Sequence, residues 1–562
     1  MRLWGPWHRR LHSQVSHITT PIFYPNARPH LGHLYSSLLC DVFHRWQLFK
    51  KGSSLFTTGT DEHGLKIQAA SERAGYASPR EFVDNLCRDF VKLDRAGDIR
   101  FTRFIRTTDA DHVENVRKLW KLCDLNGFIY RGEHKGWYSV SDETFYPESK
   151  VQRSGTDADK FINTETGNEV VYHTETNYFF KLSAFRERLV AYITENPRFI
   201  DPSAKRLQVL RELQEEGGLP DISISRPSSR LKWGIDVPGD PSQKVYVWFD
   251  ALCNYVSSVG GIDAILQDAI PEVALRHEGG NLEVSSAEWW RNTTHVIGKD
   301  IIKFHTIYWP AFLMAAGLPL PKQIVVHSHW LSNGVKMSKS LGNVVDPLLM
   351  IDHYGRDAMR WFLLENSQLE DDNNFQEDKL HSTRELLVSK WGNLVNRCCG
   401  AKFNLQRAVA TFASMDRETL LNLLDGDQML KEAVQKLFTE LDMISEKMDG
   451  YISRFESRAA LRNVWSVIDL SNTLIQDSKP WTKEGPQQDV IIYACMEASR
   501  ILSILCQPII PSLAARLLDR IDVPLDRRSV AFTKVGTDDL YGRGSNERGR
   551  PVPLQRKPLR EQ

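Results

Sequence analysis

The sequence predicts an α/β fold built on a doubly wound parallel sheet, with an insertion inside it and an all-α helical bundle after it. Two β-α-β patterns, at residues 17–61 and about 292–332, predict the two halves of the sheet. Strand signals stop near residue 376, and amphipathic stretches such as "QMLKEAVQKLFTELDMISEKM" then predict the bundle.

The first β-α-β pattern begins with "SHITTPIFY", which is β-branched and aromatic and therefore a strand candidate ending near Tyr24. The next segment places Leu34, Leu38, Val42 and Trp46 at four-residue steps, which predicts a helix that Gly52 closes. The stretch "SSLFTTGTDEHG" predicts a second strand, ending at Asp61.

The second pattern consists of the strand "NTTHVIG", a helix over "KDIIKFHTIYWPAFLMAAG" with Pro310 inside it, and the strand "KQIVVHSHWL". In doubly wound sheets, ligands bind at the carboxyl ends of the strands, where the strand order reverses. The segments "YPNARPHLGH" and "GTDEHG" follow predicted strands, so we expect functional side chains in both.

These patterns divide the chain. Residues 17–130 and 231–330 are expected to form the two halves of a Rossmann-like catalytic domain, and 131–230 a turn-rich connective insertion. Residues 331–375 are expected to hold a glycine-hinged loop and a linker, and 376–535 the helical domain. Residues 536–562 are basic and rich in Gly and Pro, which predicts a disordered tail.

Composition excludes several protein classes. The 562 residues have zero formal net charge, so a nucleic acid would be bound by local patches, and no apolar run approaches the ~20 residues of a membrane span. The eight cysteines are scattered without a C-x-x-C pair, which argues against a disulfide framework or a zinc site and fits a reducing compartment. Residues 1–16 are basic and free of acids, which indicates a mitochondrial transit peptide or a plain basic N-terminus.

Two short motifs carry the chemistry. "HLGH" places His30, Gly32 and His33 at the start of a helix, where backbone N–H groups favour phosphate. "NGVKMSKSLGN" places Lys336 and Lys339 in a loop between glycines. Each motif alone is weak, since the second on its own is more typical of a solvated turn. Together they predict a triphosphate held from two sides and covered by a lid.

The two motifs resemble the H-I-G-H and K-M-S-K-S signatures of class I aminoacyl-tRNA synthetases, with Leu31 in place of isoleucine. The blocks "TTPIFYPNARPHLGH", "FTTGTDEHGLKI", "YVWFDALCNY", "HVIGKDIIKFH" and "VKMSKSLGN" resemble methionyl-tRNA synthetases in particular, and occur in the same order. The resemblance extends from about residue 17 to residue 530.

The resemblance implies three groups of site residues and an anticodon-binding role for the helical bundle. ATP would be bound by His30, Gly32, His33, Gly298, Asp300, Lys336 and Lys339, of which the two histidines and two lysines would be catalytic. Methionine would be bound by Ile22, Tyr24, Asp61, Trp248, Ala251, Leu252, Tyr255 and His305. The anticodon would be read by Asn393, Arg397 and Trp481.

The resemblance further implies a compact mitochondrial methionine–tRNA ligase, acting as a monomer in the matrix on L-methionine, ATP with Mg²⁺, and tRNA(Met). Many family members carry cysteine-ligated zinc in the insertion. This chain has no cysteine between Cys123 and Cys253, so no structural zinc is expected.

Other interpretations stay open at this point. Leucyl, isoleucyl and valyl enzymes would need a larger insertion for editing, and a cysteinyl enzyme would need thiolate zinc ligands. A catalytically inactive relative that only holds tRNA would keep the fold without the activity. For Trp248, Tyr255 and Trp481 the alternative is ordinary core packing, and for Asn393 and Arg397 a solvated helix face.

Overall fold

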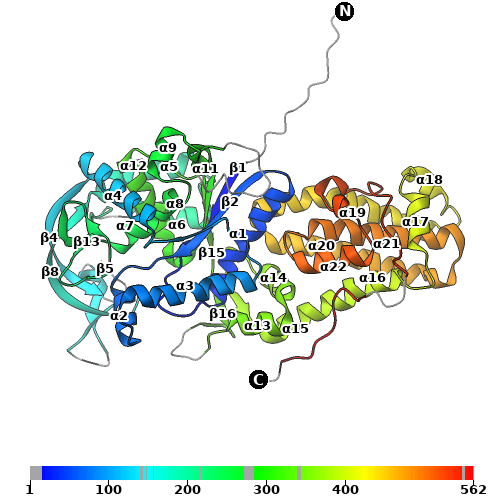
Figure 1. Ribbon diagram of the computed structural model, residues 1–562, viewed down its shortest axis with the longest axis horizontal. Coiled ribbons are helices and arrows are strands. Elements are labelled where there is room, and N and C mark those ends of the chain that lie inside the picture. Colours follow the sequence, from blue (N-terminus) through cyan, green and yellow to red (C-terminus); the bar gives the residue numbers. More distant parts are fainter. Residues whose placement is uncertain are drawn as a thin grey trace, which may run out of the picture. The chain divides into compact units, whose positions relative to one another are not determined.

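The computed structural model describes residues 15–139, 144–146, 148–155, 157, 159–215, 218–270, 284–337, 343–546 and 551–560. The chain divides into two units (Figure 1). Unit 1 comprises residues 1–29, 53–94 and 100–327, and unit 2 comprises residues 30–52, 95–99 and 328–562.

Unit 1 is built on a six-stranded sheet in which all neighbouring strands are parallel. Its order is β3 (Arg103–Arg106), β2 (Ser53–Thr60), β1 (Val15–Thr19), β14 (Thr293–Gly298), β15 (Gln323–His327) and β9 (Ile200–Asp201). The chain winds outward from β1 in one direction and from β14 in the other. The strand order therefore reverses between β1 and β14, which confirms the doubly wound sheet.

The central strands are buried along almost their whole length, as expected for a parallel sheet covered on both faces. At Gly59 the backbone of β2 passes so close to β3 that a Cβ atom would lie 1.8 Å from the carbonyl oxygen of Ile105. Only glycine fits there, which explains the glycine in "TTGT".

The helices of unit 1 lie around this sheet (Figure 1). They are α2 (Leu65–Arg73), α3 (Pro79–Ala96, with its last two residues in unit 2), α4 (Ala110–Leu125), α5 (Arg186–Glu195), α6 (Ser203–Gln214), α7 (Val247–Leu252), α8 (Asn254–Ser257), α9 (Ile262–Gln267), α11 (Ser286–Arg291) and α12 (Trp309–Ala316). A single hydrophobic cluster joins residues from α4, α5, α6, α7, α8, α11 and α12 to the strands.

The expected insertion is only partly separate from this sheet. Its main element is an antiparallel sheet formed by β4 (Ile129–Ser139) and β8 (Glu169–Phe180), with shorter strands β5 (Thr144–Tyr146), β6 (Val151–Arg153), β7 (Phe161–Asn163) and β10 (Ile222–Ser223). Strand β9 also falls between residues 131 and 230, yet it pairs with β15 at the edge of the parallel sheet. The expected insertion at 131–230 therefore includes one strand, β9, that belongs to the parallel sheet.

Unit 2 contains α1 (Leu31–Phe49), although this helix lies between β1 and β2 in the sequence. Asp41 of α1 is fully buried and forms an ion pair of 2.6 Å with Arg360 of α14 (Arg356–Glu365). The Arg360 guanidinium also donates to the carbonyl oxygens of Gly97, Pro508 and Ile509. These contacts bind α1 to the helical part of the chain.

Within 331–375, where the sequence predicts a loop and a linker, the described residues are folded and belong to unit 2. They form β16 (Trp330–Ser332), β17 (Val335–Lys336), α13 (Pro347–Tyr354), α14 and β18 (Asn373–Phe375). Asn333 and Gly334 join β16 to β17 with φ of 49° and 79°, the signs that a two-residue type I′ hairpin turn needs. Gly334 therefore lies in a hairpin turn at the start of the expected glycine-flanked loop, and the hinge role of that loop stays a prediction.

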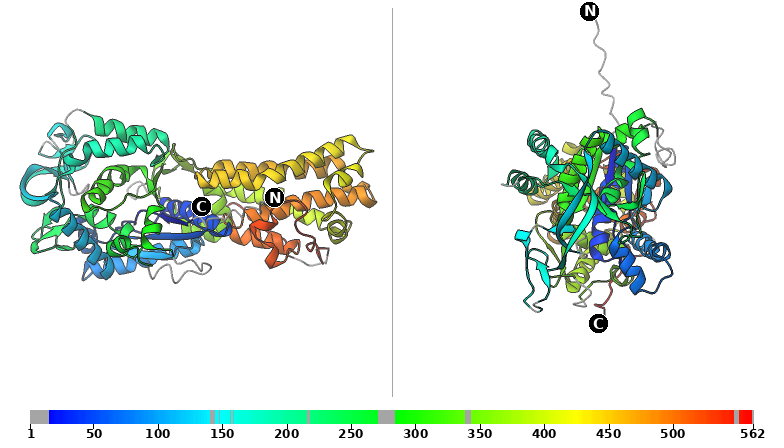
Figure 2. Two further views of the ribbon diagram at one scale, coloured as in Figure 1. Left: turned by 90° about the horizontal axis from the view of Figure 1, so that it is seen from above. Right: turned by 90° about the vertical axis from the view of Figure 1, so that its left-hand side faces the viewer.

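The helical bundle begins with α15 (Glu377–Leu386), a π-turn at Leu387–Gly392, α16 (Asn393–Cys398), α17 (Leu405–Phe412) and α18 (Arg417–Asn422). The long helices α19 (Gln428–Ser453), α20 (Ser457–Ser478) and α21 (Gly485–Leu505) then pack side by side, followed by α22 (Pro511–Arg520) (Figures 1 and 2). The mostly buried α21 is the centre of this bundle.

The C-terminal segment differs from the disordered tail that the composition predicts. Arg560 pairs with Glu377 at 2.9 Å, and the backbone of residues 553–558 accepts hydrogen bonds from arginine and histidine side chains of α13, α15 and α22. An ion pair and hydrogen bonds to the backbone thus hold residues 553–560 against other elements of unit 2, despite the Pro and basic residues in this segment.

Candidate functional site

Asp61 follows β2 at the carboxyl edge of the sheet, and its backbone N–H donates to the Phe23 carbonyl at 2.9 Å. Its side chain is 6% exposed. Tyr24, in the segment that follows β1, donates its hydroxyl to the carbonyl of His63 at 3.0 Å. These two hydrogen bonds therefore connect the segments after β1 and β2, both of which the sequence predicts to be functional.

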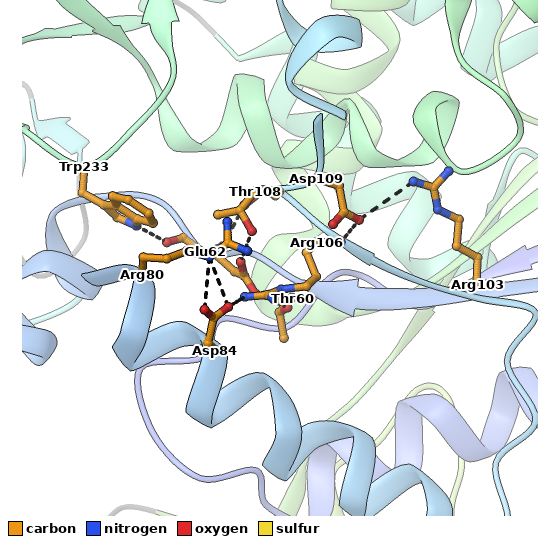
Figure 3. Close-up of polar contacts among 10 residues, drawn as sticks. Thr60, Glu62, Arg80, Asp84, Arg103, Arg106, Thr108, Asp109 and Trp233 are labelled. Atoms are coloured by element: carbon orange, nitrogen blue, oxygen red, sulfur yellow. Dashed lines mark hydrogen bonds and ion pairs between the residues drawn. The ribbon is translucent and has the colours of Figure 1, made fainter. Parts of the chain in front are cut away.

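Glu62 anchors the same segment through the hydrogen bonds of its side chain (Figure 3). Its fully buried carboxylate accepts hydrogen bonds from Thr60, Thr108 and Arg106, at 2.8, 2.6 and 2.7 Å. Burial alone would lower the pKa of Arg106, but its pairing with Glu62 and Asp84 raises that pKa. The result is a rigid backbone around Asp61.

The side chains of Tyr255 (α8) and His305 meet directly, with the hydroxyl 2.7 Å from Nε2. His305 Nδ1 lies 2.9 Å from the Ile301 carbonyl, which can only accept, so Nδ1 carries a proton. Burial lowers the pKa of His305 to about 4, so the ring is neutral near pH 7 and Nε2 is an acceptor. The Tyr255 hydroxyl therefore donates to His305.

Trp248 (α7) stacks on Phe304 with ring centroids 3.7 Å apart, and its edge approaches His305. Phe304 and His305 belong to a π-turn, Phe304–Tyr308, directly before α12. Such turns often occur at functional sites, and this one accommodates Pro310 at the start of α12. The single helix that the sequence predicts is therefore a 3₁₀ turn, a π-turn and α12 in succession.

The remaining candidates of unit 1 lie in α7, in the segment that follows β1, and at the end of β14 or directly after it. Ala251 and Leu252 are buried in α7, and Ile22 is half-buried. Gly298 ends β14, and Asp300 lies in the 3₁₀ turn Lys299–Ile301 that follows. Tyr24, Trp248, Leu252 and Tyr255 pack in or against one hydrophobic cluster.

Sequence reasoning missed Phe304, and it missed a buried carboxylate, Asp250, that lies between two histidines, His63 and His112. Phe304, Asp250 and His63 stand inside the quoted blocks "HVIGKDIIKFH", "YVWFDALCNY" and "FTTGTDEHGLKI". Adjacency to a predicted pocket residue was the available signal.

In unit 2, His30 and His33 cap α1 reciprocally. His30 Nδ1 accepts from the backbone N–H of Gly32 at 3.1 Å, and His33 Nδ1 accepts from that of His30 at 3.0 Å. Because both Nδ1 atoms are acceptors, the proton of each neutral ring is on Nε2. Burial, followed by the neighbouring His30, keeps the pKa of His33 well below its usual value. The helix start thus presents two N–H donors of defined tautomer.

Only part of the second motif lies within the described residues. Lys336 ends β17, the second strand of the hairpin, and Lys339 lies outside the described residues. The hairpin turn is fixed by the Gly334 N–H, which donates to Asn374 at 2.7 Å.

The three anticodon candidates lie in the helical part of unit 2. Asn393 is half-buried and Arg397 is exposed on α16, one turn apart. Trp481, in the 3₁₀ turn Pro480–Thr482, is 43% exposed, which excludes the interpretation as a core residue. Gln488 of α21 holds this turn by donating to the carbonyl oxygens of Pro480 and Lys483.

Residues 16–399 match the family described as class I tRNA synthetases (M), and residues 425–533 match the anticodon-binding domain of methionyl tRNA ligase. The chain is 60% identical over 560 residues to the mitochondrial methionine–tRNA ligase of Saccharomyces cerevisiae. The aligned residues make up 98% of this chain and 97% of that protein. This chain belongs to the methionyl-tRNA synthetase family. The other class I synthetases considered above are thereby excluded.

More distant members of the methionyl-tRNA synthetase family match as well. The human mitochondrial methionine–tRNA ligase is 39% identical over 527 residues, which make up 92% of this chain and 85% of the human protein. The structure resembles Mycobacterium tuberculosis methionyl-tRNA synthetase bound by methionyl-adenylate, with a TM-score of 0.78 and 33% identity over 93% of this chain and 97% of that chain.

Neither a metal-binding cluster nor a membrane-spanning helix occurs among the described residues. They contain no group of three or more His, Cys, Asp or Glu side chains arranged to hold a metal ion. Among these same residues, no helix is both long and apolar enough to cross a bilayer.

Proposed function

We propose that the residues named above carry out methionine activation and transfer in the mitochondrial matrix, with the chain acting as a monomer that needs no membrane. As a methionyl-tRNA synthetase, the chain is a methionine–tRNA ligase: it forms methionyl-adenylate from L-methionine and ATP and transfers the methionyl group to tRNA. The observation that carries the proposal is the match to both the synthetase and the anticodon-binding families along one chain. Relatives named as mitochondrial support the location.

The first step needs no protein nucleophile. A carboxylate oxygen of methionine attacks the α-phosphorus of ATP, a new P–O bond forms, and the bond to the departing pyrophosphate breaks. His30 and His33 would each donate a hydrogen bond from Nε2–H to the phosphate oxygens on which negative charge accumulates. Lys336 and Lys339 would supply positive charge to the departing pyrophosphate, with Gly32, Gly298 and Asp300 beside the nucleotide.

Methionine binding would rest on the carboxyl edge of the parallel sheet in unit 1. The Asp61 carboxylate would pair with the α-ammonium group. The side chain would lie among Ile22, Tyr24, Trp248, Ala251, Leu252, Tyr255 and His305. Sulfur–aromatic contacts contribute about 0.3–1.5 kcal/mol, and the Tyr255–His305 pair adds a polar contact that an all-hydrocarbon side chain could not satisfy.

Transfer of the methionyl group would follow recognition of tRNA(Met) by the helical domain. Exposed Trp481 offers a ring on which an anticodon base can stack, and Arg397 and Asn393 offer donors to base edges. A tRNA ribose hydroxyl then attacks the carbonyl of the adenylate, and AMP leaves.

Two further proposals concern metals. Mg²⁺ would enter with ATP, because Mg²⁺ in such sites is bound largely by substrate phosphates. No structural zinc is proposed, since the insertion lacks cysteine and the cysteines elsewhere are scattered and buried.

Pyrophosphate exchange against a panel of amino acids tests the proposal. Exchange should depend on methionine, and His33→Ala and Lys339→Ala should each lower its kcat by about 10²–10³ while methionine affinity changes little. An absence of exchange in the folded wild type would indicate an inactive relative that only holds tRNA. Equal losses of rate and methionine affinity would place His33 and Lys339 in ground-state binding.

A further inference from the structure

A buried carboxylate lies directly beside the proposed methionine pocket. Asp250 of α7 is 1% exposed. Its Oδ2 lies 2.7 Å from His63 Nδ1, and its Oδ1 lies 2.7 Å from His112 Nε2 of α4. An ionised carboxylate only accepts hydrogen bonds, so both histidines donate to it.

This carboxylate stays ionised although it is buried. Burial alone would raise the pKa of Asp250, but the two histidines outweigh that effect and lower it. A buried ion costs several kcal/mol to desolvate, and a well-packed apolar group at such a position is often at least as stable. The Asp250 carboxylate is therefore expected to add little to the stability of the fold. Its better-supported role is to hold the neighbouring segments in place.

The neighbours of Asp250 are the elements that carry the pocket candidates. Within α7, Asp250 comes two residues after Trp248 and directly before Ala251 and Leu252. His63 comes two residues after Asp61, and its carbonyl accepts the Tyr24 hydroxyl. The Asp250–His63 contact thus joins the segments after β1 and β2 to α7, and His112 joins all three to α4.

We propose that Asp250 is a positioning residue for methionine binding: its carboxylate, shared between His63 and His112, sets the placement of Asp61 relative to α7. It acts through the segments it joins and touches no reacting atom. This inference rests on the proposed methionine site. It predicts that breaking the contact weakens methionine binding selectively, because the ammonium partner and the side-chain pocket lose their fixed separation.

The test uses paired substitutions in the full-length protein. In His63→Asn the amide nitrogen can take the place of Nδ1 and still donate to Asp250, whereas His63→Leu cannot donate. Asp250→Asn leaves one accepting oxygen for two donors. As a matched control, Asp240→Asn alters a carboxylate of unit 1 that accepts from Tyr178 and Ser242, neither of which is a pocket candidate.

The measurements are KM for methionine, KM for ATP and kcat in pyrophosphate exchange, with Tm recorded for every variant. His63→Leu and Asp250→Asn should raise KM for methionine about tenfold or more and change KM for ATP less than about twofold. His63→Asn and Asp240→Asn should stay near wild type. If Asp250→Asn does not fold, the comparison of His63→Leu with His63→Asn still tests the inference.

Two outcomes would overturn the inference: an unchanged KM for methionine in His63→Leu, whatever its Tm, or a parallel rise in both KM values. Failure of the underlying site assignment looks different. In that case Asp61→Ala would leave methionine binding unaltered, and an absence of exchange in the wild type would reject the activity itself.

Discussion

The proton on His305 is placed by the backbone. The Ile301 carbonyl requires a proton on Nδ1, and this choice makes Nε2 the acceptor for Tyr255. The same logic places the protons of His30 and His33 on Nε2, because backbone N–H groups occupy both Nδ1 atoms. The sequence predicts His30, His33 and His305 as site residues, but their tautomers depend on carbonyl and amide groups that only the folded backbone brings near.

The lowered pKa of His305 makes stability depend on pH. The unfolded ring titrates near 6.5 and the folded ring near 4, so between these values the unfolded state binds more protons. The free energy of unfolding should therefore fall as pH decreases from about 6.5 toward 4, by about 1.4 kcal/mol per pH unit for this one group. Urea unfolding at pH 7.5, 6 and 5 measures it.

A His305→Gln variant is the comparison for that experiment, because His17, with a pKa lowered to about 3 by burial, contributes a similar slope in both proteins. Between pH 6.5 and 5 the free energy of unfolding of the variant should fall less steeply than that of the wild type, by about 1.4 kcal/mol per pH unit. Identical slopes would mean that His305 is protonated in the folded protein over this range.

At the scale of the element, α1 shows how far sequence reasoning reaches. Its four-residue apolar steps predict a helix, and the structure confirms it at Leu31–Phe49. Periodicity cannot show which part of the chain the apolar face meets, and α1 belongs to unit 2 although the strands on either side of it belong to unit 1. Likewise, Asn333 and Gly334 are a known hairpin signal, but glycines on both sides of two lysines are also typical of a hinged loop.

Gly32 offers a prediction in which stability and activity separate. A Cβ at this position would lie 3.0 Å from His30 Cε1, so in Gly32→Ala the ring of His30 must shift from its capping position. Alanine is favoured over glycine within helices by up to about 1 kcal/mol, so Tm should hold or rise. The kcat of pyrophosphate exchange should fall several-fold, with methionine affinity by equilibrium dialysis unchanged. An unchanged kcat would show that the ring position is not required.

At the scale of the whole molecule, the two units divide the proposed work. The methionine candidates lie in unit 1, whereas the HLGH histidines, the Lys336 hairpin and the anticodon candidates lie in unit 2. The sequence predicts the doubly wound parallel sheet and the helical character of residues 376–535. It does not predict this division, because the division depends on long-range contacts such as Asp41–Arg360 and on the return of β9 to the parallel sheet.

Trp481→Ala should separate the two reactions of the enzyme. Methionine-dependent pyrophosphate exchange should remain almost intact, whereas aminoacylation of tRNA(Met) should fall about 10- to 100-fold, since base stacking contributes roughly 1–3 kcal/mol. The variant should also discriminate less between a CAU anticodon and an altered one. Because Trp481 is 43% exposed, Tm should change little. A parallel loss of both reactions would argue against an anticodon role.

The membership of α1 in unit 2 constrains how the protein can be cut into pieces. A fragment that begins at residue 328 would contain Arg360 but not Asp41, and the buried guanidinium would lose its counter-charge. Breaking a buried pair in this way costs about 3–5 kcal/mol, a large share of the stability of an ordinary domain. A soluble helical fragment should therefore require residues 30–52 to be supplied as well, either fused through a new linker or added as a separate peptide.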